Sequence, residues 1–191
     1  MLSYIIGKAN HIEKPELKEV LALIFNEKIQ VVAHNPQWKQ QYIDEVSLLK
    51  QAPCLSTLAY EHIGSTAIPN IKAKPIIDII IGVNNFPPRK EIIEEIQESG
   101  YTYMQEMSVP DRLYFITRGQ RNFNVHVIAF KGSVWNNDVL FRNYMINHFE
   151  KAQEYSDLKE DPHPSSPQPL YHIQPNQILH GTGDLARSAV L

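Results

Sequence analysis

The residues with the clearest chemical potential lie between Glu61 and Asp78. The run Glu61-His62-Ile63-Gly64-Ser65-Thr66-Ala67-Ile68-Pro69 places Gly-Ser-Thr directly after a stretch typical of a strand. A glycine followed by hydroxyl residues at a sharp turn can offer backbone N–H groups and an O–H group to an oxyanion. Turns of this kind are also common as ordinary strand-to-helix connections with an N-cap serine. The pattern therefore indicates either a phosphate-binding turn or a structural one.

A single carboxylate, Asp78, stands inside the apolar run 75–83. The isoleucines on both sides of it leave neither face polar, which predicts a strand covered on both sides. Burying an isolated carboxylate is costly unless a cation, a metal ion or hydrogen-bond donors compensate. Two interpretations of Asp78 stay open: a structural ion pair, with Lys74 or an arginine, or a functional metal ligand.

A histidine, His126, is the next candidate. It shares one face of a predicted strand with Asn124 and Ile128, because side chains alternate along a strand. Its imidazole can ligate a metal, act as a base, or be a hydrogen-bonded core group. Basic residues near the predicted strand ends are candidates for neutralising phosphate oxygens, or are simply solvated. They are Lys72, Lys74, Arg112, Arg118 and Arg121.

The elements that must position these residues follow from apolar periodicity and turn residues. Helices are expected over about 15–28, from Asn35-Pro36 to near Pro53, from Pro87 to Gly100, and over 134–159 as one helix or two. In the last of these, the residues expected to face inward are Trp135, Val139, Leu140, Tyr144 and Phe149. Strands are expected over 31–33, 58–63, 75–83, 101–104, 113–117 and 123–130. This order favours an α/β or α+β domain around one sheet.

Composition sets further limits. With 18 Lys+Arg against 21 Asp+Glu the net charge is −3, which argues against broad electrostatic binding to nucleic acid. One cysteine, Cys54, excludes an internal disulfide and a cysteine-based zinc site. No apolar run long enough for a membrane helix and no secretion signal is visible, so we expect a cytoplasmic protein. We expect residues 1–160 to form a single domain and the proline-rich residues 161–191 to form an irregular tail.

The run His62 to Pro69, followed by Ala73-Lys74-Pro75-Ile76-Ile77-Asp78-Ile79, closely resembles the signature of the GrpB-like family, a branch of the nucleotidyltransferase-fold superfamily. The resemblance covers roughly 31–159. It implies a small mixed β-sheet flanked by helices, with Gly64 and Ser65 in a phosphate-binding turn and Asp78 on a metal-binding strand. Similar proteins are expected to continue with an amphipathic helix beyond residue 160, where this chain is irregular. Two hypotheses explain the difference: a shifted reading frame in the gene, or genuine divergence of the sequence.

The resemblance also implies a chemistry. Nucleotidyl transfer uses divalent ions, usually held by three carboxylates, to neutralise a triphosphate and stabilise the leaving pyrophosphate. The superfamily's usual second carboxylate is replaced here, because the pattern reads Asp78-Ile79-Ile80, and the later strand offers His126. The expected cofactor is Mg²⁺ or Mn²⁺. Because imidazole suits Mn²⁺ or Zn²⁺ better than Mg²⁺, Zn²⁺ is the alternative. The expected ligands are Asp78, His126 and His62.

The resulting hypothesis is a nucleotidyltransferase-like protein that binds a nucleotide or phosphorylated small molecule, with metal-dependent transfer to an acceptor that the sequence does not define. Asp78 and His126 would be catalytic. The phosphate-binding residues would be Gly64, Ser65, Thr66, Lys72, Lys74 and Arg112. Two alternatives are a binding module that has lost transfer chemistry and a protein-interaction scaffold using 134–159. No membrane or specific DNA partner is expected.

Overall fold

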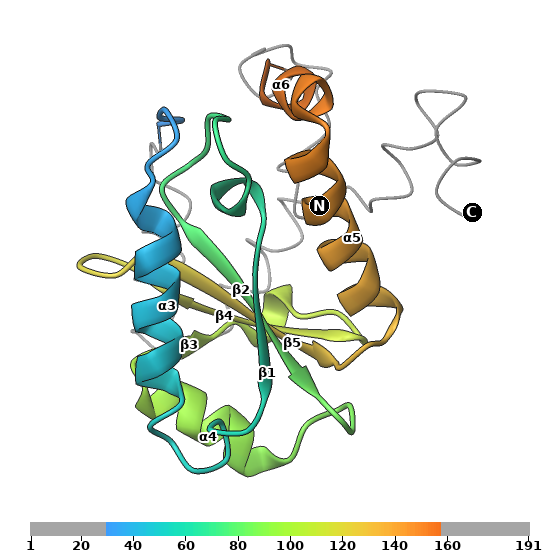
Figure 1. The fold of residues 1–191 in the computed structure, drawn as a ribbon. Coiled ribbons are helices and arrows are strands. Elements are labelled where there is room, and N and C mark those ends of the chain that lie inside the picture. Colours follow the sequence, from blue (N-terminus) through green and yellow to red (C-terminus); the bar gives the residue numbers. More distant parts are fainter. Residues whose placement is uncertain (1–29, 158–191) are drawn as a thin grey trace.

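The computed structural model describes residues 30–157. The helix expected over 15–28 and the tail expected over 161–191 lie outside the described residues. Within the described part, the chain forms a five-stranded mixed sheet with helices packed on both sides (Figure 1). The expected α+β class, with a small mixed sheet flanked by helices, is confirmed.

The elements follow one another in an order close to the predicted one. The helices are α3 (Gln37–Leu49), α4 (Lys90–Glu98), α5 (Ser133–Asn147) and α6 (Phe149–Asp157), with short 3-10 helices η1 (Ser65–Ala67) and η2 (Gln105–Met107). The strands are β1 (Ala59–Ile63), β2 (Ile77–Val83), β3 (Thr102–Tyr103), β4 (Arg112–Thr117) and β5 (Phe123–Ala129).

The sheet has the strand order β1-β2-β5-β4-β3. Strands β2 and β5 run parallel, and the other three pairs are antiparallel. The register places Asp78 beside Asn124 and Ile80 beside His126 across the parallel pair. Tyr114 of β4 lies beside His126 on its other side. Three neighbouring strands therefore bring polar side chains to one region of the sheet.

Alternation along β2 and β5 gives the sheet two chemically different faces. The face that packs against α3 and α4, which we call the core face, is apolar and joins buried side chains from both helices into one cluster. Its strand residues include Ile77, Ile79, Ile81, Phe115, Val125 and Val127. Burial on both sides explains why β2 reads as a nearly continuous run of isoleucines.

The opposite face, which we call the site face, carries Asp78, Asn124 and His126 at the end of the sheet near the Gly64 turn. Farther along the same face, Ile80 and Ile128 pack with Ile63 of β1 and Trp135 of α5. Figure 1 shows α5 on the side of the sheet opposite α3. Helix α5 therefore covers the apolar part of the site face and leaves the polar residues beside it.

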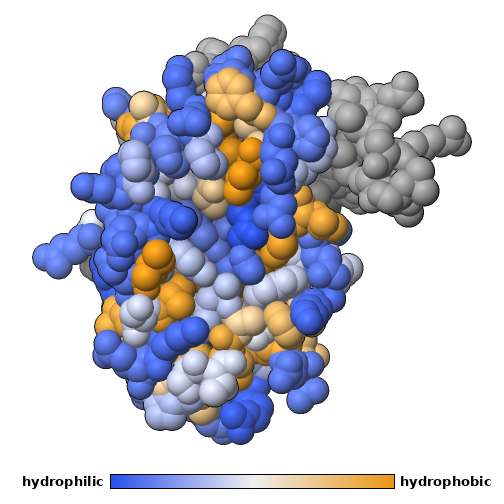
Figure 2. All heavy atoms as spheres, in the orientation of Figure 1, coloured by the Kyte–Doolittle hydropathy of each residue, from blue (hydrophilic) through white to orange (hydrophobic). Residues whose placement is uncertain are grey.

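Some local expectations were wrong. The strand expected over 31–33 is reduced to an isolated bridge between Val32 and Ala73, because only one residue finds an antiparallel partner. Leu140 and Phe149, expected to face inward, are 65% and 58% exposed. Their helical region breaks between α5 and α6, so a single inward stripe does not continue through it. Figure 2 shows apolar groups reaching this surface in separate places among hydrophilic ones.

Within residues 30–157, no helix combines the length and apolar character needed to cross a bilayer.

Candidate functional site

The turn after β1 is built around Gly64. Its backbone has φ 71° and ψ −173°, a conformation that residues with a side chain rarely adopt. A Cβ at this position would collide with the Asp78 carboxylate, with Oδ2 nearest. Glycine is required here for two reasons, the positive φ and the close approach of Asp78. The turn therefore lies directly against the one carboxylate of β2.

The turn is held in place from the core face by His62 and Thr66. His62 Nε2 lies 3.0 Å from Thr66 Oγ1, and the imidazole stacks on the Tyr42 ring of α3 at 5.0 Å. Burial lowers the pKa of His62 to about 4, against the smaller opposing effect of the Asp78 charge. His62 is therefore neutral at pH 7 and supports the turn. The structure does not bring it to the face that carries Asp78 and His126.

Helix α6 holds the turn from another direction. A side-chain hydrogen bond links Tyr155 to Ser65, and the backbone N–H of Lys72 donates to Ser156 Oγ at 3.1 Å. Ile68 and Ile71, which follow η1, pack into a buried cluster with Met145 and Ala152. The Gly64 turn and the segment after it are thus fixed by α3 and α6 together. No local pattern in the sequence indicated the Tyr155 contact.

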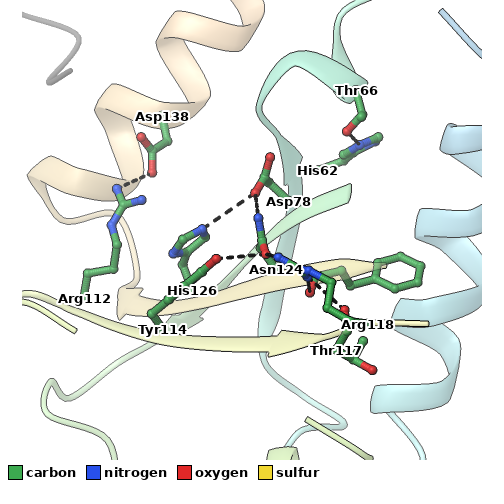
Figure 3. Close-up of polar contacts among 11 residues, drawn as sticks. His62, Thr66, Asp78, Arg112, Tyr114, Thr117, Arg118, Asn124, His126 and Asp138 are labelled. Atoms are coloured by element: carbon green, nitrogen blue, oxygen red, sulfur yellow. Dashed lines mark hydrogen bonds and ion pairs between the residues drawn. The ribbon is translucent and has the colours of Figure 1, made fainter. Parts of the chain in front are cut away.

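Asp78 is the centre of the polar network on the site face (Figure 3). Asn124 Nδ2 donates to Asp78 Oδ1 at 2.7 Å, and His126 Nε2 lies 3.9 Å from the same oxygen. The Asp78 side chain is 21% exposed, so water and a ligand can reach it. An amide donor and a neighbouring histidine therefore accompany the carboxylate, which stays partly exposed.

His126 lies deeper in the sheet than Asp78. Its imidazole stacks on the Tyr114 ring at 4.9 Å, and its side chain is 9% exposed. Burial lowers the pKa of His126, and this effect outweighs the favourable contact with Asp78. Within the described part of the chain, Nδ1 is buried without a hydrogen-bond partner. His126 is therefore a neutral imidazole at pH 7, with its Nε2 edge toward Asp78.

Arg112 forms an ion pair with Asp138, not with Asp78. Its Nη2 donates to Asp138 Oδ2 of α5 at 2.8 Å, and the two side chains are 24% and 15% exposed. Burial raises the pKa of Asp138 despite the nearby guanidinium. Sequence reasoning missed Asp138, although it lies beside the inward-facing Trp135 and Val139 positions of a predicted helix. Arg112 thus reaches the site region already paired.

The two arginines of the β4–β5 turn have opposite placements. Arg118 donates to Asn124 Oδ1 at 2.8 Å, on the site face. Arg121 instead donates to the buried carboxylate of Glu45 at 2.9 Å and to the Ser99 carbonyl at 2.9 Å. Glu45 also accepts a hydrogen bond from Tyr101. Arg121 is therefore a structural residue of the core side, and the clamp interpretation does not hold for it.

The remaining basic residues lie at the rim. Lys72 and Lys74 are exposed on the segment between η1 and β2. Arg142 of α5, which sequence reasoning did not select, donates to Glu61 Oε2 and to the His62 carbonyl at 2.8 Å. It ties α5 to the end of β1, one residue before Ile63 leads into the turn.

The site offers few side-chain ligands for a metal ion. Within residues 30–157, no group of three or more His, Cys, Asp or Glu side chains is arranged to hold an ion. Asp78 and His126 lie near enough to contribute to one ion, with 3.9 Å between Oδ1 and Nε2, but Oδ1 already accepts the Asn124 hydrogen bond, which leaves Oδ2 as the carboxylate ligand. Mg²⁺ is often held by one or two carboxylates and the phosphates of its ligand. The described residues therefore suit at most one ion, and they lack the three carboxylates that a two-ion site uses.

Comparison with known proteins places the chain in a family. The family model described as "GrpB protein" matches residues 28–170, and the chain belongs to the GrpB family. It is 30% identical over 174 residues to the UPF0157 protein YqkA of Bacillus subtilis, covering 91% of this chain and 49% of that protein. The chain therefore spans about half the length of that relative.

Two further similarities support the family assignment. The glutamate-rich protein GrpB of Alkalihalophilus pseudofirmus is 29% identical over 140 residues, which cover 70% of this chain and 80% of that protein. The crystal structure of the conserved protein GrpB from Enterococcus faecalis superposes with a TM-score of 0.62 at 29% identity. The superposition covers 83% of this chain and 87% of that one.

Proposed function

We propose that the chain binds the phosphate group of a nucleotide or phosphorylated small molecule at the Gly64 turn, together with one divalent ion held by Asp78. The observation that carries this proposal is the contact between the turn and Asp78. A Cβ at Gly64 would meet the Asp78 carboxylate, so the turn that would bind phosphate lies directly against the carboxylate that would hold the ion. Phosphate would meet the N–H groups, and the ion would screen it from Asp78.

The neighbouring residues have separate parts in this proposal. Ser65 and Thr66 belong to the turn itself, and both are held by side chains from other elements, Tyr155 and His62. Lys72 and Lys74, exposed on the next segment, supply positive charge at the rim. Arg112 is paired with Asp138, so it contributes less to phosphate binding than an unpaired arginine would.

A second candidate function, metal-dependent nucleotidyl transfer, is favoured by one observation: a neutral histidine lies beside Asp78. In such a reaction an acceptor hydroxyl would attack the α-phosphorus, the bond to pyrophosphate would break, and a base would take the hydroxyl proton. His126 Nε2, 3.9 Å from Asp78 Oδ1, is suited to that role because its imidazole is uncharged at pH 7. The bound ion would supply charge neutralisation on the phosphates.

Thermal unfolding tests the proposal directly. A ligand that binds only the folded state at a hundred times its Kd adds about 2.7 kcal/mol of stability. We expect ATP, GTP or pyrophosphate to raise the melting temperature with Mg²⁺ or Mn²⁺ and to do so weakly in EDTA. Asp78→Asn should abolish the metal-dependent part, whereas Asp111→Asn, at an exposed position of the η2–β4 connection, should leave it unchanged. Absence of any shift with these ligands would refute the proposal.

A product assay separates the two candidate functions. Incubation with nucleoside triphosphate and Mn²⁺ should release pyrophosphate only if the chain transfers nucleotides to an acceptor present in the mixture. If transfer occurs, His126→Gln should slow it by roughly 100-fold to 10,000-fold while preserving the thermal shift. Ligand binding without product, in the presence of cell extract as the source of acceptors, favours the binding module.

A further inference from the structure

We propose that Arg118 is a positioning residue for this site: through Asn124 it fixes the orientation in which the Asp78 carboxylate faces the Gly64 turn. The chain of contacts runs from Arg118 on the β4–β5 turn to Asn124 on β5 and then to Asp78 on β2 (Figure 3). The proposal rests on the proposed function for its ligand-binding consequence, whereas its structural consequence can be measured without a ligand.

The orientation of the Asn124 amide follows from donor chemistry. Arg118 Nη2 lies 2.8 Å from Asn124 Oδ1, and the Tyr114 hydroxyl lies 2.9 Å from the same atom. A guanidinium can only donate hydrogen bonds, so the atom that faces it must be the amide oxygen. The amide nitrogen is then directed to Asp78, where it donates to Oδ1 at 2.7 Å.

Arg118 is well anchored for this role. Its Nη1 donates to the carbonyls of Thr117 and Phe123, each at 2.9 Å, which are the last residue of β4 and the first of β5. The guanidinium therefore bridges the two strands at the point where they separate into the turn. Moving it toward a bound phosphate would break these bonds, so we assign it to the support of Asn124 instead of a phosphate clamp.

As a consequence, the two carboxylate oxygens of Asp78 have different neighbours. Oδ1 is occupied by the Asn124 amide, and Oδ2 is the atom that a Cβ at Gly64 would meet first. Asp78 therefore presents one oxygen to a divalent ion shared with phosphate, not two. Without Arg118 the amide can turn its oxygen toward Asp78, which places two acceptors together and releases the carboxylate to rotate.

The direct test follows the Asn124 side-chain amide in proton–nitrogen NMR spectra of the full chain, assigned by its loss in Asn124→Ala. In the native protein we expect a hydrogen-bonded, slowly exchanging NH₂ pair. Arg118→Met should shift this pair and speed its exchange with solvent by at least about tenfold, and Arg118→Lys should restore part of the protection. Unchanged signals in Arg118→Met would overturn the proposal.

Two further variants control the result. Arg121→Met removes the same type of side chain from the same turn, but its partners Glu45 and Ser99 lie on the core side, so the Asn124 signals should stay as in the native protein. Tyr114→Phe removes one of the two donors to Asn124 and keeps the aromatic ring that stacks on His126. If Arg118→Met does not fold, Arg118→Lys takes its place, because one ammonium cannot bond Thr117, Phe123 and Asn124 together: faster exchange of the amide pair than in the native protein supports the proposal, and native exchange rejects it.

Titration with Mn²⁺ and ATP gives the functional readout. Supporting residues of a metal site typically change affinity by about 10-fold to 100-fold, so Arg118→Met should weaken binding by that factor and Arg121→Met by less than about twofold. Equal binding by Arg118→Met and the native chain would overturn the positioning role. If the native chain binds neither ion nor nucleotide, the proposed function fails, while the amide signals still decide whether Arg118 orients Asn124.

Discussion

The side chain of Asn124 donates a hydrogen bond to Asp78 across the parallel strands β2 and β5, with 2.7 Å between Nδ2 and Oδ1. The two residues are direct partners in the strand register, and their side chains have the same length. This contact holds the one charged residue of an otherwise apolar strand in a fixed orientation.

Gly64→Ala should destabilise the protein by about 2 to 4 kcal/mol, because alanine must adopt a positive φ and its Cβ meets the Asp78 carboxylate. Gly119→Ala is the matched control, since Gly119 also has a positive φ, of 97°, but open space around a Cβ. It should cost only about 1 kcal/mol. Urea unfolding measures both values. Similar losses in the two variants would contradict the close approach of Asp78 to the turn.

Asn124→Asp should convert the contact into a pair of carboxylates. Without metal we expect a loss of about 2 kcal/mol at pH 7, because two like charges face each other on neighbouring strands. Mn²⁺ or Ca²⁺ should recover this loss by binding between them. Melting temperatures in EDTA and with each ion measure the effect.

The control for this variant is Asn122→Asp, just before β5, where the side chain accepts a hydrogen bond from Gly119 and has no contact with Asp78. It should show no metal-dependent stabilisation. An Asn124→Asp protein that is as stable as the native one in EDTA would speak against the observed geometry.

Stability should fall on acidification because His62 has a lowered pKa in the folded state. Its folded pKa is about 4 and its unfolded pKa is 6.5, so the unfolded chain binds the proton first as the pH falls. The stabilisation is complete above pH 6.5 and decreases by about 3 kcal/mol toward pH 4. His62→Gln should flatten this slope while keeping a partner for Thr66. Unfolding free energies measured between pH 4 and 7.5 check it, and an unchanged slope would be contrary to burial of a neutral His62.

Arg121→Met should cost about 2 to 4 kcal/mol, because it leaves the Glu45 carboxylate, whose side chain is 4% exposed, with a buried charge and one fewer partner. The double variant Glu45→Gln, Arg121→Met should recover a large part of this loss, since no charge then remains buried. Chemical denaturation of the four proteins of this cycle gives the coupling energy. Additive effects would show that the pair contributes no specific interaction.

Much of the fold could be predicted from local patterns. The isoleucines on both sides of Asp78 predicted the doubly covered strand β2, and Gly64 marked a turn that the structure confirms. Proline and glycine signals placed α4 between Pro88 and Gly100. These patterns are informative because each depends on neighbours in the chain: burial on both faces of one strand, or a backbone conformation open to one residue type.

The arrangement of the site depends on register, which local patterns do not contain. Antiparallel pairing of Ile63 with Asp78 puts Ile63 on the site face and therefore turns His62 toward α3, away from His126. The roles of Asn124 and Arg118 have the same origin, because an amide or arginine in a sequence does not indicate which strand it will contact. Asp138 reaches Arg112 only because α5 packs against β1 and β5, and β4 is the next strand after β5.

The alternation of β2 and β5 makes this protein unusually sensitive to changes in chain length at a few positions. Inserting one residue before Asn124 would move it and His126 into the layer filled by Ile79 and Phe115, and would turn Val125 toward the water-accessible side. This one insertion would remove Asn124 and His126 from the polar network around Asp78 and would disrupt the packing of the apolar core face. A substitution in these strands changes one side chain, whereas an insertion or deletion of one residue in either strand would disrupt both the candidate site and the core.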